Sequence, residues 1–185
     1  MYHYLLLGLL FLSLNACESE PTSTTSEPVT AARNPERWVE ADGQRLGWYT
    51  YDQLKPLLEI DNDTTYVVNF WATWCKPCIE ELPAFQKLYQ QYKDQKVHLI
   101  LVSLDFEKQL TTKLIPYLNT HQIQGEVPIL SQKGMNDWIE KIHPNWSGSL
   151  PATLIYQGKR RQFFEQKFEY SALEVKLKQF MNIRE

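Results

Sequence analysis

The chain has 185 residues, 43% of them hydrophobic and 22% charged, which provides enough apolar material for one sizeable core and no sign of a second. The formal net charge is −3 at pH 7 and the basic residues are scattered, apart from a short cluster at 159–161, which excludes the strongly basic surface of a nucleic-acid-binding protein. We therefore expect a single domain that works as a monomer and binds no nucleic acid.

The N-terminal segment has the pattern of an export signal. Residues 5–14 are almost wholly apolar, but about 20 such residues are needed to span a bilayer as a helix, so the run has the length of a signal-peptide core. It ends at Leu14-Asn15-Ala16-Cys17, which resembles the lipobox of bacterial lipoproteins, although no Lys or Arg precedes the run and Asn15 is larger than usual. We expect residues 1–16 to be a signal peptide and Cys17 to carry lipid. An ordinary signal peptide with a chance cysteine is the alternative.

A polar segment separates this signal from the rest of the chain. Residues 18–37 are rich in Ser, Thr, Glu and Pro and have almost no large apolar side chain, so they cannot offset the entropy lost on ordering. We expect residues 17–37 to be a flexible tether and residues 38–185 to be the domain. A lipid-tethered domain would work at the periplasmic or extracytoplasmic face of a bacterial membrane, outside the reducing cytoplasm.

The hydrophobic pattern of the domain alternates between strand and helix periods. We expect a short strand or two in residues 38–50, further strands over residues 66–72, 97–103, 127–130, 152–156 and 162–168, and helices over residues 51–60, 75–92, 110–120, 135–142 and 171–183. Residues 66–72 are apolar on both alternating faces except at Asn69, which is typical of a strand in the middle of a mostly parallel sheet. This order predicts an α/β three-layer sandwich.

Two cysteines stand where a predicted strand gives way to a predicted helix, in Trp74-Cys75-Lys76-Pro77-Cys78. At a helix start they lie one turn apart and can close a small disulfide, and unpaired backbone N–H groups stabilise the thiolate of the first. Such a pair is also half of a zinc site, but a second pair of ligands is lacking because the histidines are dispersed. We expect no metal. A buried structural disulfide remains the other alternative, although such bridges usually close longer loops.

The residues around this pair carry a more specific pattern. The stretch 67–78, Val-Val-Asn-Phe-Trp-Ala-Thr-Trp-Cys-Lys-Pro-Cys, followed by Glu81-Leu82-Pro83, resembles the TlpA and ResA branch of membrane-tethered thiol-disulfide oxidoreductases in the thioredoxin-like superfamily. The resemblance runs from about Trp38 to the end of the chain. The expected strand and helix between about 123 and 143 resemble the insertion of that branch. The fold implied is a thioredoxin-like three-layer α/β/α sandwich with an extra β-α insertion before the cis-proline strand.

The resemblance and the helix position together assign roles to three residues. Cys75 would be the attacking thiol and Cys78, one turn deeper, the resolving thiol that releases the partner. Asn69 stands where plain thioredoxins have a buried aspartate that moves a proton, and an amide cannot do this. The resemblance places the functional glutamate at Glu81, where apolar surroundings would raise its pKa. The residues alone favour the alternative, a surface glutamate in an ordinary helix pair.

A second set of residues would bind the substrate. Pro151 matches the cis-proline that faces the cysteine pair in thioredoxin-like folds, whereas sequence alone favours a trans proline that opens an edge strand. The backbone of Leu150 would then pair with an extended partner peptide as an added strand. Trp74, beside the nucleophile, would line the partner groove. Trp146 has an equal claim to packing and to recognition.

These expectations point to a lipid-tethered enzyme that reduces disulfides in cysteine-containing exported proteins. Apocytochrome c thiols are a typical target in the family. A reductase outside the cytoplasm needs a membrane thiol electron donor, and no cofactor is expected. The motif does not define the direction of exchange, so oxidation stays open. A thiol peroxidase is one alternative, although no arginine lies near the motif in sequence. A copper-binding chaperone, with His143 as the only candidate third ligand, is another.

Overall fold

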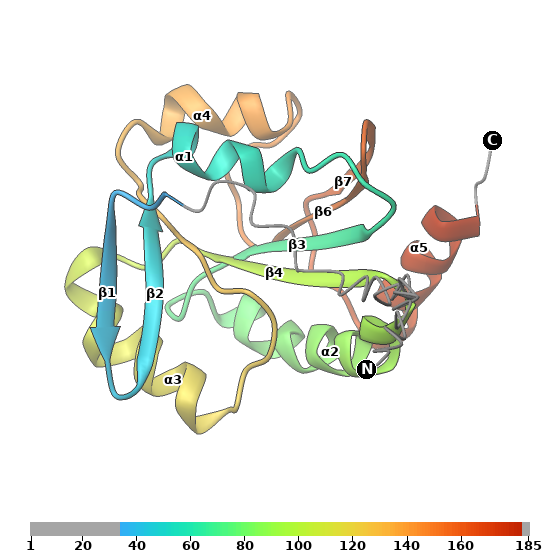
Figure 1. The fold of residues 1–185 in the computed structure, drawn as a ribbon. Helices are drawn as coiled ribbons and strands as arrows, with labels where there is room; N and C mark the ends of the chain where they lie inside the picture. Colours follow the sequence, from blue (N-terminus) through green and yellow to red (C-terminus); the bar gives the residue numbers. More distant parts are fainter. Residues whose placement is uncertain (1–33, 183–185) are drawn as a thin grey trace, which may run out of the picture.

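A seven-stranded sheet, in the order β1-β2-β5-β4-β3-β6-β7, forms the middle layer of the fold (Figure 1). This computed structural model describes residues 34–182. The predicted signal peptide over residues 1–16, the predicted lipidation site Cys17 and the predicted tether up to residue 33 lie outside the described residues. The first strand begins at Arg37, one residue before the predicted start of the domain.

The sheet is mixed, with its parallel strands in the middle. Its strands are β1 (Arg37–Ala41), β2 (Gln44–Tyr49), β3 (Thr65–Trp71), β4 (Val97–Ser103), β5 (Ile129–Leu130), β6 (Ala152–Gln157) and β7 (Arg160–Phe164). Strand β3 runs parallel to β4 and antiparallel to β6. Strand β5, which belongs to the predicted insertion, pairs in parallel with β2 and β4, so the hairpin β1–β2 extends the sheet beyond the insertion.

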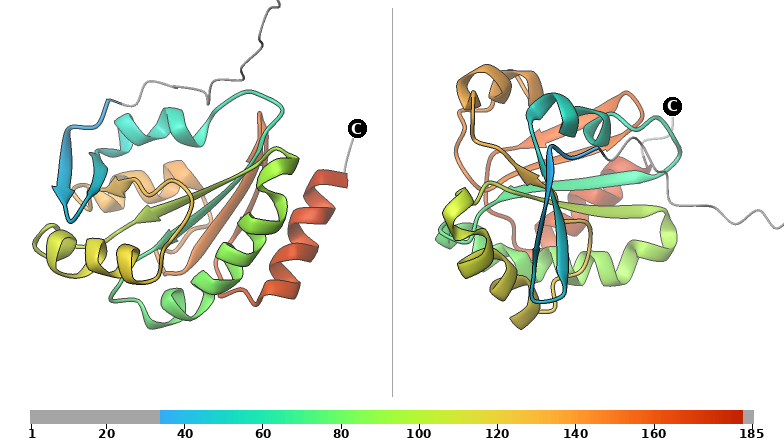
Figure 2. Two further views of the ribbon diagram at one scale, coloured as in Figure 1. Left: turned by 60° about the horizontal axis from the view of Figure 1, so that its bottom comes forward. Right: turned by 60° about the vertical axis from the view of Figure 1, so that its left-hand side comes forward.

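Helices cover both faces of this sheet. They are α1 (Tyr51–Leu54), α2 (Lys76–Tyr92), α3 (Ile115–Thr120), α4 (Met135–Ile142) and α5 (Tyr170–Asn182). Helices α1 and α4 lie on one face and α2, α3 and α5 on the other, with α2 and α5 side by side (Figures 1 and 2). The rings of Tyr51 and Trp138 stack with centroids 6.4 Å apart and join α1 to α4. The predicted three-layer α/β/α sandwich with its extra β-α unit is confirmed.

The core is centred on β3, and every residue of this strand is buried. Because helices cover both faces of the sheet, the strand needs apolar side chains on both, which explains its Val, Phe and Trp residues. Asn69 is the polar exception in the middle of the strand, and its side chain is fully buried. A buried amide needs hydrogen-bond partners, so this position points to the functional site.

Two predicted helices are wrong in their extent, and a proline explains each difference. Helix α1 ends at Leu54 and a 3-10 turn, η1 (Lys55–Leu58), replaces the rest of the helix expected up to residue 60. The segment expected to be helical over 110–120 begins with a π-helical turn, η4 (Leu110–Leu114), before α3. Pro56 and Pro116 have no N–H to donate to the carbonyl four residues earlier, so neither segment continues as one α-helix.

The strand predicted over residues 162–168 is also displaced, because β7 ends at Phe164. After this point the chain leaves the sheet: the Glu165 carboxylate accepts hydrogen bonds from backbone N–H groups of the loop before β6, and the Phe168 N–H donates to Glu81. Two short 3-10 turns, η2 (Lys93–Gln95) and η3 (Glu107–Gln109), complete the elements. None of the helices within residues 34–182 is both long enough and apolar enough to cross a membrane.

Candidate redox site

The site begins where β3 ends and α2 starts. The N–H of Cys75 donates to the carbonyl of Ala72 at 3.1 Å, which closes the connecting turn, and Cys75 is the N-cap residue of α2. Pro77 occupies the first turn, where its missing N–H costs nothing. The other N–H groups of this turn have no partner within the helix, so the positive end of the helix dipole faces Cys75.

Cys75 and Cys78 form a disulfide, with an S–S distance of 2.03 Å and their Cα atoms 5.3 Å apart. The two cysteine residues differ in access: Cys75 is 6% exposed and Cys78 is not exposed at all. An incoming thiol or disulfide can therefore reach only Cys75. The structure thus brings the two predicted thiols together, and of the two only the predicted nucleophile Cys75 keeps a small exposed area.

Glu81 lies one turn beyond Cys78 on α2 and is only 1% exposed. Its Oε1 accepts a hydrogen bond from Asn69 Nδ2 at 2.8 Å, and its Oε2 accepts one from the backbone N–H of Phe168 at 2.7 Å. The alternative of a surface glutamate is therefore excluded. The neighbouring Glu80 is half exposed and pairs with Lys167 at 2.9 Å, so it is directed away from Glu81's partners.

The surroundings of Glu81 favour its protonated form. Burial raises the pKa of Glu81 to about 7, although the hydrogen bonds from Phe168 and Asn69 and the nearby charge of Lys167 oppose the shift. A group with this pKa gains and loses a proton readily near neutral pH, as a general acid or base must. Glu81 therefore combines burial, a fixed position and a suitable pKa.

Asn69 is the residue that links β3 to this carboxyl group. Besides its bond to Glu81, its Nδ2 lies 3.3 Å from Thr153 Oγ1 and 3.4 Å from the Ala152 carbonyl. Its Oδ1 is buried without a hydrogen-bond partner. The amide therefore serves as a donor that holds the Glu81 carboxylate, in the position where plain thioredoxins carry an acid of their own.

The loop before β6 contains a cis peptide bond between Leu150 and Pro151, as the resemblance implies. The Glu165 carboxylate holds this loop, because the N–H groups of Ser147 and Ser149 each donate to it at 3.1 Å. Trp146 Nε1 donates to the Ser149 carbonyl at 2.9 Å. The backbone before Pro151 is thus fixed by side chains on both sides of the loop.

An apolar pocket of about 230 Å³ adjoins the cysteine turn. Its walls include Trp74 and Leu150, two of the predicted substrate-binding residues, together with Phe106, Met135, Trp138 and Trp146. Trp74 is 49% exposed and stacks on Phe106 with centroids 5.7 Å apart. Trp146 is largely buried against Phe70 and Phe163, so it packs in the core and also contributes one wall.

Sequence reasoning missed two residues of the β4–η3 connection, Asp105 and Phe106. Asp105 is fully buried and its carboxylate binds Thr73, two residues before Cys75. Burial raises the pKa of Asp105, while hydrogen bonds from Thr73 and Ser103 lower it. The available signal was an acidic residue two positions after a buried strand, because the carboxyl ends of neighbouring parallel strands meet at one edge of the sheet.

No group of three or more His, Cys, Asp or Glu side chains in residues 34–182 is placed to hold a metal ion. His143, the candidate copper ligand, stacks on Phe163 with centroids 4.5 Å apart, and its Nδ1 accepts a hydrogen bond from the Asn145 N–H at 3.3 Å. Both contacts fix the His143 ring as part of the packing beneath the loop.

A disulfide at the start of the helix that follows the central strand, combined with a cis-proline loop, defines the thioredoxin-like class of protein. The AhpC/TSA family model matches residues 51–160, and the chain belongs to that family. Among solved structures, the thiol:disulfide interchange protein of Chlorobium tepidum TLS has a TM-score of 0.56 and 16% identity, over 82% of this chain and 99% of that chain. The thioredoxin-related protein of Neisseria meningitidis serogroup B has a TM-score of 0.51 and 24% identity, over 64% of this chain and 86% of that chain. These likenesses confirm the fold.

Curated relatives agree with the predicted branch. The thiol-disulfide oxidoreductase ResA of Oceanobacillus iheyensis is 37% identical over 84 residues, which cover 43% of this chain and 44% of the relative. ResA of Bacillus anthracis is 47% identical over 89 residues, which cover 48% of this chain and 46% of the relative. The chain thus spans about half the length of the curated relatives it matches. The predicted resemblance to the ResA branch is confirmed.

Proposed function

We propose that the protein is a thiol-disulfide oxidoreductase that reduces disulfides in exported proteins through Cys75 and Cys78. The observation that supports this most strongly is the disulfide at the start of α2, in which only Cys75 retains exposed surface. Curated relatives that carry the name thiol-disulfide oxidoreductase support the same reaction.

The reaction starts from the dithiol form of the protein. The Cys75 thiolate attacks one sulfur of the substrate disulfide, that S–S bond breaks, and the other substrate sulfur leaves as a thiol. Cys78 then attacks the Cys75 sulfur of the mixed disulfide, closes the Cys75–Cys78 bond and releases the second substrate sulfur. Two electrons and two protons have then passed from the protein dithiol to the substrate.

Two features of the site assist these steps. The N-terminus of α2 stabilises the Cys75 thiolate, so Cys75 attacks while Cys78 is still a thiol. Cys78 must lose its proton before it can attack, and Glu81 lies on the same helical stripe one turn away. A carboxyl group with a pKa of about 7 can accept this proton and pass it on.

The apolar pocket supports a role in substrate binding for Trp74, Leu150 and Pro151. An extended substrate segment would pair with the backbone of Leu150 as an added strand, with its cysteine over Cys75. A large apolar side chain beside that cysteine would fill the pocket behind Trp74. Because these contacts use backbone and apolar surface, they would suit unfolded or partly folded polypeptides rather than one folded partner.

The proposed setting follows from the N-terminal segment. Lipid on Cys17 and a tether over residues 17–37 would hold the domain as a monomer at the periplasmic or extracytoplasmic face of a membrane, where disulfides persist. Continued turnover there requires a membrane thiol donor that returns the Cys75–Cys78 disulfide to the dithiol. Apocytochrome c, whose cysteines must be reduced, is the substrate we propose for this family member.

A trapping experiment in the native host tests this function. Full-length Cys78→Ser cannot resolve the mixed disulfide, so we expect exported proteins to stay bonded to Cys75 on non-reducing gels and to be identified by mass spectrometry. The matched Cys75→Ser variant should trap nothing. If Cys78→Ser captures no exported protein, or if both variants capture the same set, the proposed function is wrong.

A further inference from the structure

A fully buried carboxyl group lies beside the turn that leads to Cys75. The N–H of Thr73 lies 3.1 Å and 3.2 Å from Oδ1 and Oδ2 of Asp105, and the Thr73 hydroxyl donates to Oδ1. The Ser103 hydroxyl donates to Oδ2 at 2.9 Å. The steps of thiol exchange described above use none of these groups. Burial of a carboxyl group is costly unless hydrogen bonds compensate it, and here Thr73 and Ser103 supply them.

Asp105 is the middle of three contacts that join two segments distant in sequence. On one side of it, the N–H of Leu104 donates to the carbonyl of Trp71 at 2.8 Å. On the other side, Phe106 stacks on Trp74. Three successive residues after β4 therefore hold the last residue of β3 and two residues of the turn that follows it, and only the central contact is made by a carboxyl group.

The segment held in this way carries the nucleophile. The turn closed by the Cys75 N–H and the Ala72 carbonyl contains Thr73, whose N–H and hydroxyl both bind Asp105. The side-chain partners of Asp105 are neutral donors from Thr73 and Ser103. A carboxylate can accept all of them at once, whereas an amide has a single acceptor oxygen.

We propose that Asp105 is a positioning residue for the thiol exchange: by holding Thr73, it keeps the Cys75 sulfur at the N-terminus of α2. The helix dipole stabilises a thiolate only within the first turn, so a displaced sulfur would lose both thiolate character and alignment with the substrate disulfide. The consequence for the exchange rate rests on the proposed function, whereas the consequence for Cys75 ionisation does not.

Variants at Thr73 test the proposal most cleanly, because they leave the charge of Asp105 in place. In the reduced full-length Thr73→Val protein, we expect a higher thiolate pKa of Cys75. We also expect a kcat for reduction of a peptide disulfide about tenfold lower than that of the wild type, with KM changed less than about twofold. Thr73→Ser restores the hydroxyl and should restore both values. Asp105→Asn should lower kcat at least as much as Thr73→Val.

Asp63→Asn is the matched control, because Asp63 is an exposed acid paired with Lys96 and should leave kcat and the Cys75 titration unchanged. An unchanged Cys75 titration in Thr73→Val, or an unchanged kcat in folded Asp105→Asn, overturns the proposal. If Asp105→Asn does not fold, the comparison of Thr73→Val with Thr73→Ser tests the proposal by itself. If the wild type reduces no peptide disulfide, the proposed function fails, while the Cys75 titration still decides the positioning role.

Discussion

At the scale of single residues, the site depends on carboxyl groups that are buried but fully hydrogen-bonded. Glu81 receives one donor from the strand below it, Asn69 Nδ2, and one from the chain that leads into α5, the Phe168 N–H. Neither donor carries a charge, so burial dominates and the pKa of Glu81 rises to about 7. The group is thus kept in a state in which small changes of environment decide whether it is protonated.

This raised pKa predicts a pH-dependent stability. Between the ordinary pKa of 4.5 and about 7, the folded protein keeps a proton on Glu81 that the unfolded chain has released. The oxidised wild type should therefore lose about 3 kcal/mol of unfolding free energy, relative to Glu81→Gln, as the pH rises through this range. Urea unfolding of both proteins at about pH 4 and about pH 8 measures the difference.

Glu80→Gln is the control for this comparison, because the Glu80 carboxylate is on the surface and its pKa is lowered by Lys167 rather than raised. A free-energy difference between wild type and Glu81→Gln that stays constant with pH would show that Glu81 titrates normally. That outcome would remove its proposed role in proton transfer.

The positions of Cys75, Cys78 and Glu81 around the disulfide could be predicted because they lie on one short stretch with a specific pattern of spacing. The contact of Asp105 with Thr73 could not, because an acidic residue after a buried strand does not indicate which residue it meets across the sheet. The pairing of β4 with β3 is in register from Thr65 to Trp71, and it brings the residue after Leu104 to Thr73. The register between β3 and β4 cannot be predicted from any local sequence pattern.

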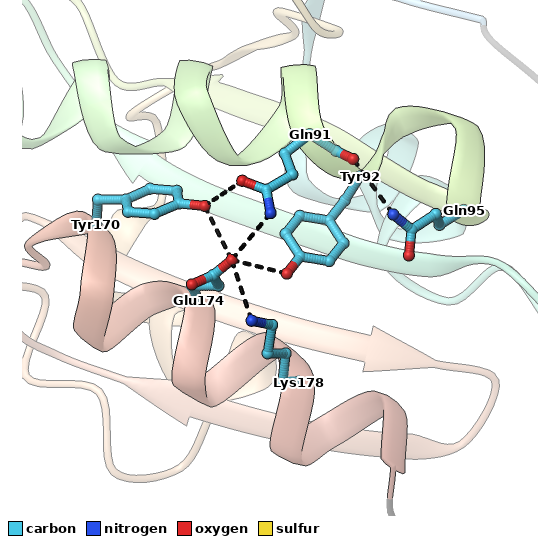
Figure 3. A network of polar contacts seen from close by, with 6 residues as sticks. All are labelled: Gln91, Tyr92, Gln95, Tyr170, Glu174 and Lys178. Carbon is cyan, nitrogen blue, oxygen red and sulfur yellow. Dashed lines mark hydrogen bonds and ion pairs between the residues drawn. The ribbon is translucent and has the colours of Figure 1, made fainter.

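At the scale of elements, a shared carboxylate fastens α5 to α2. Oε1 of Glu174 on α5 accepts hydrogen bonds from Tyr92 at 2.8 Å, Tyr170 at 2.9 Å and Gln91 at 3.2 Å, and it pairs with Lys178 at 3.3 Å (Figure 3). Two of these partners come from α2 and two from α5. Because α5 starts just after Phe168, this network also helps to fix the segment that donates to Glu81.

We expect Glu174→Gln to lower the midpoint of thermal unfolding by a few degrees at neutral pH. The Tyr92 and Tyr170 hydroxyls lower the pKa of Glu174, so its carboxylate form is favoured in the folded state. The stabilisation is present above the ordinary pKa of 4.5 and is lost as the pH falls below it. The difference in thermal unfolding midpoint between wild type and Glu174→Gln, measured by calorimetry, should therefore become smaller at acid pH.

Glu169→Gln serves as the control for this prediction, because the Glu169 side chain is 80% exposed and its carboxylate pairs with Lys167 at 3.5 Å. An equal decrease of the thermal unfolding midpoint in Glu174→Gln and Glu169→Gln would contradict the account of the network. A decrease in Glu174→Gln that does not change with pH would also contradict it.

Elements with a clear period could be predicted closely, and those interrupted by proline could not. The strand over 97–103 and the helix over 135–142 have the expected bounds. The segments with Pro56 and Pro116 bury the expected apolar faces, but part of each is a 3-10 or π turn instead of an α-helix. The hydrophobic period indicates which side chains are buried, and it does not indicate which carbonyl each N–H reaches.

At the scale of the whole molecule, the sheet places the cysteine turn, the β4–η3 connection and the cis-proline loop together at one end. Three carboxyl groups hold parts of this end: Glu81 accepts from Asn69 of β3, Asp105 binds the cysteine turn through Thr73, and Glu165 binds the cis-proline loop through Ser147. The apolar pocket lies among these segments. The fold thus surrounds one accessible sulfur with fixed backbone, which is the arrangement that ordered exchange with an extended substrate requires.

The most direct test of the central claim is mass spectrometry of the reduced protein after it reacts with a peptide disulfide. We expect the wild type to become oxidised at Cys75 and Cys78 and to release two peptide thiols. The Cys78→Ser variant should stop with one peptide bonded to Cys75, and Cys75→Ser should not react at a comparable rate. A peptide bonded first to Cys78, or a wild type that stays reduced beside an intact peptide disulfide, would contradict the account.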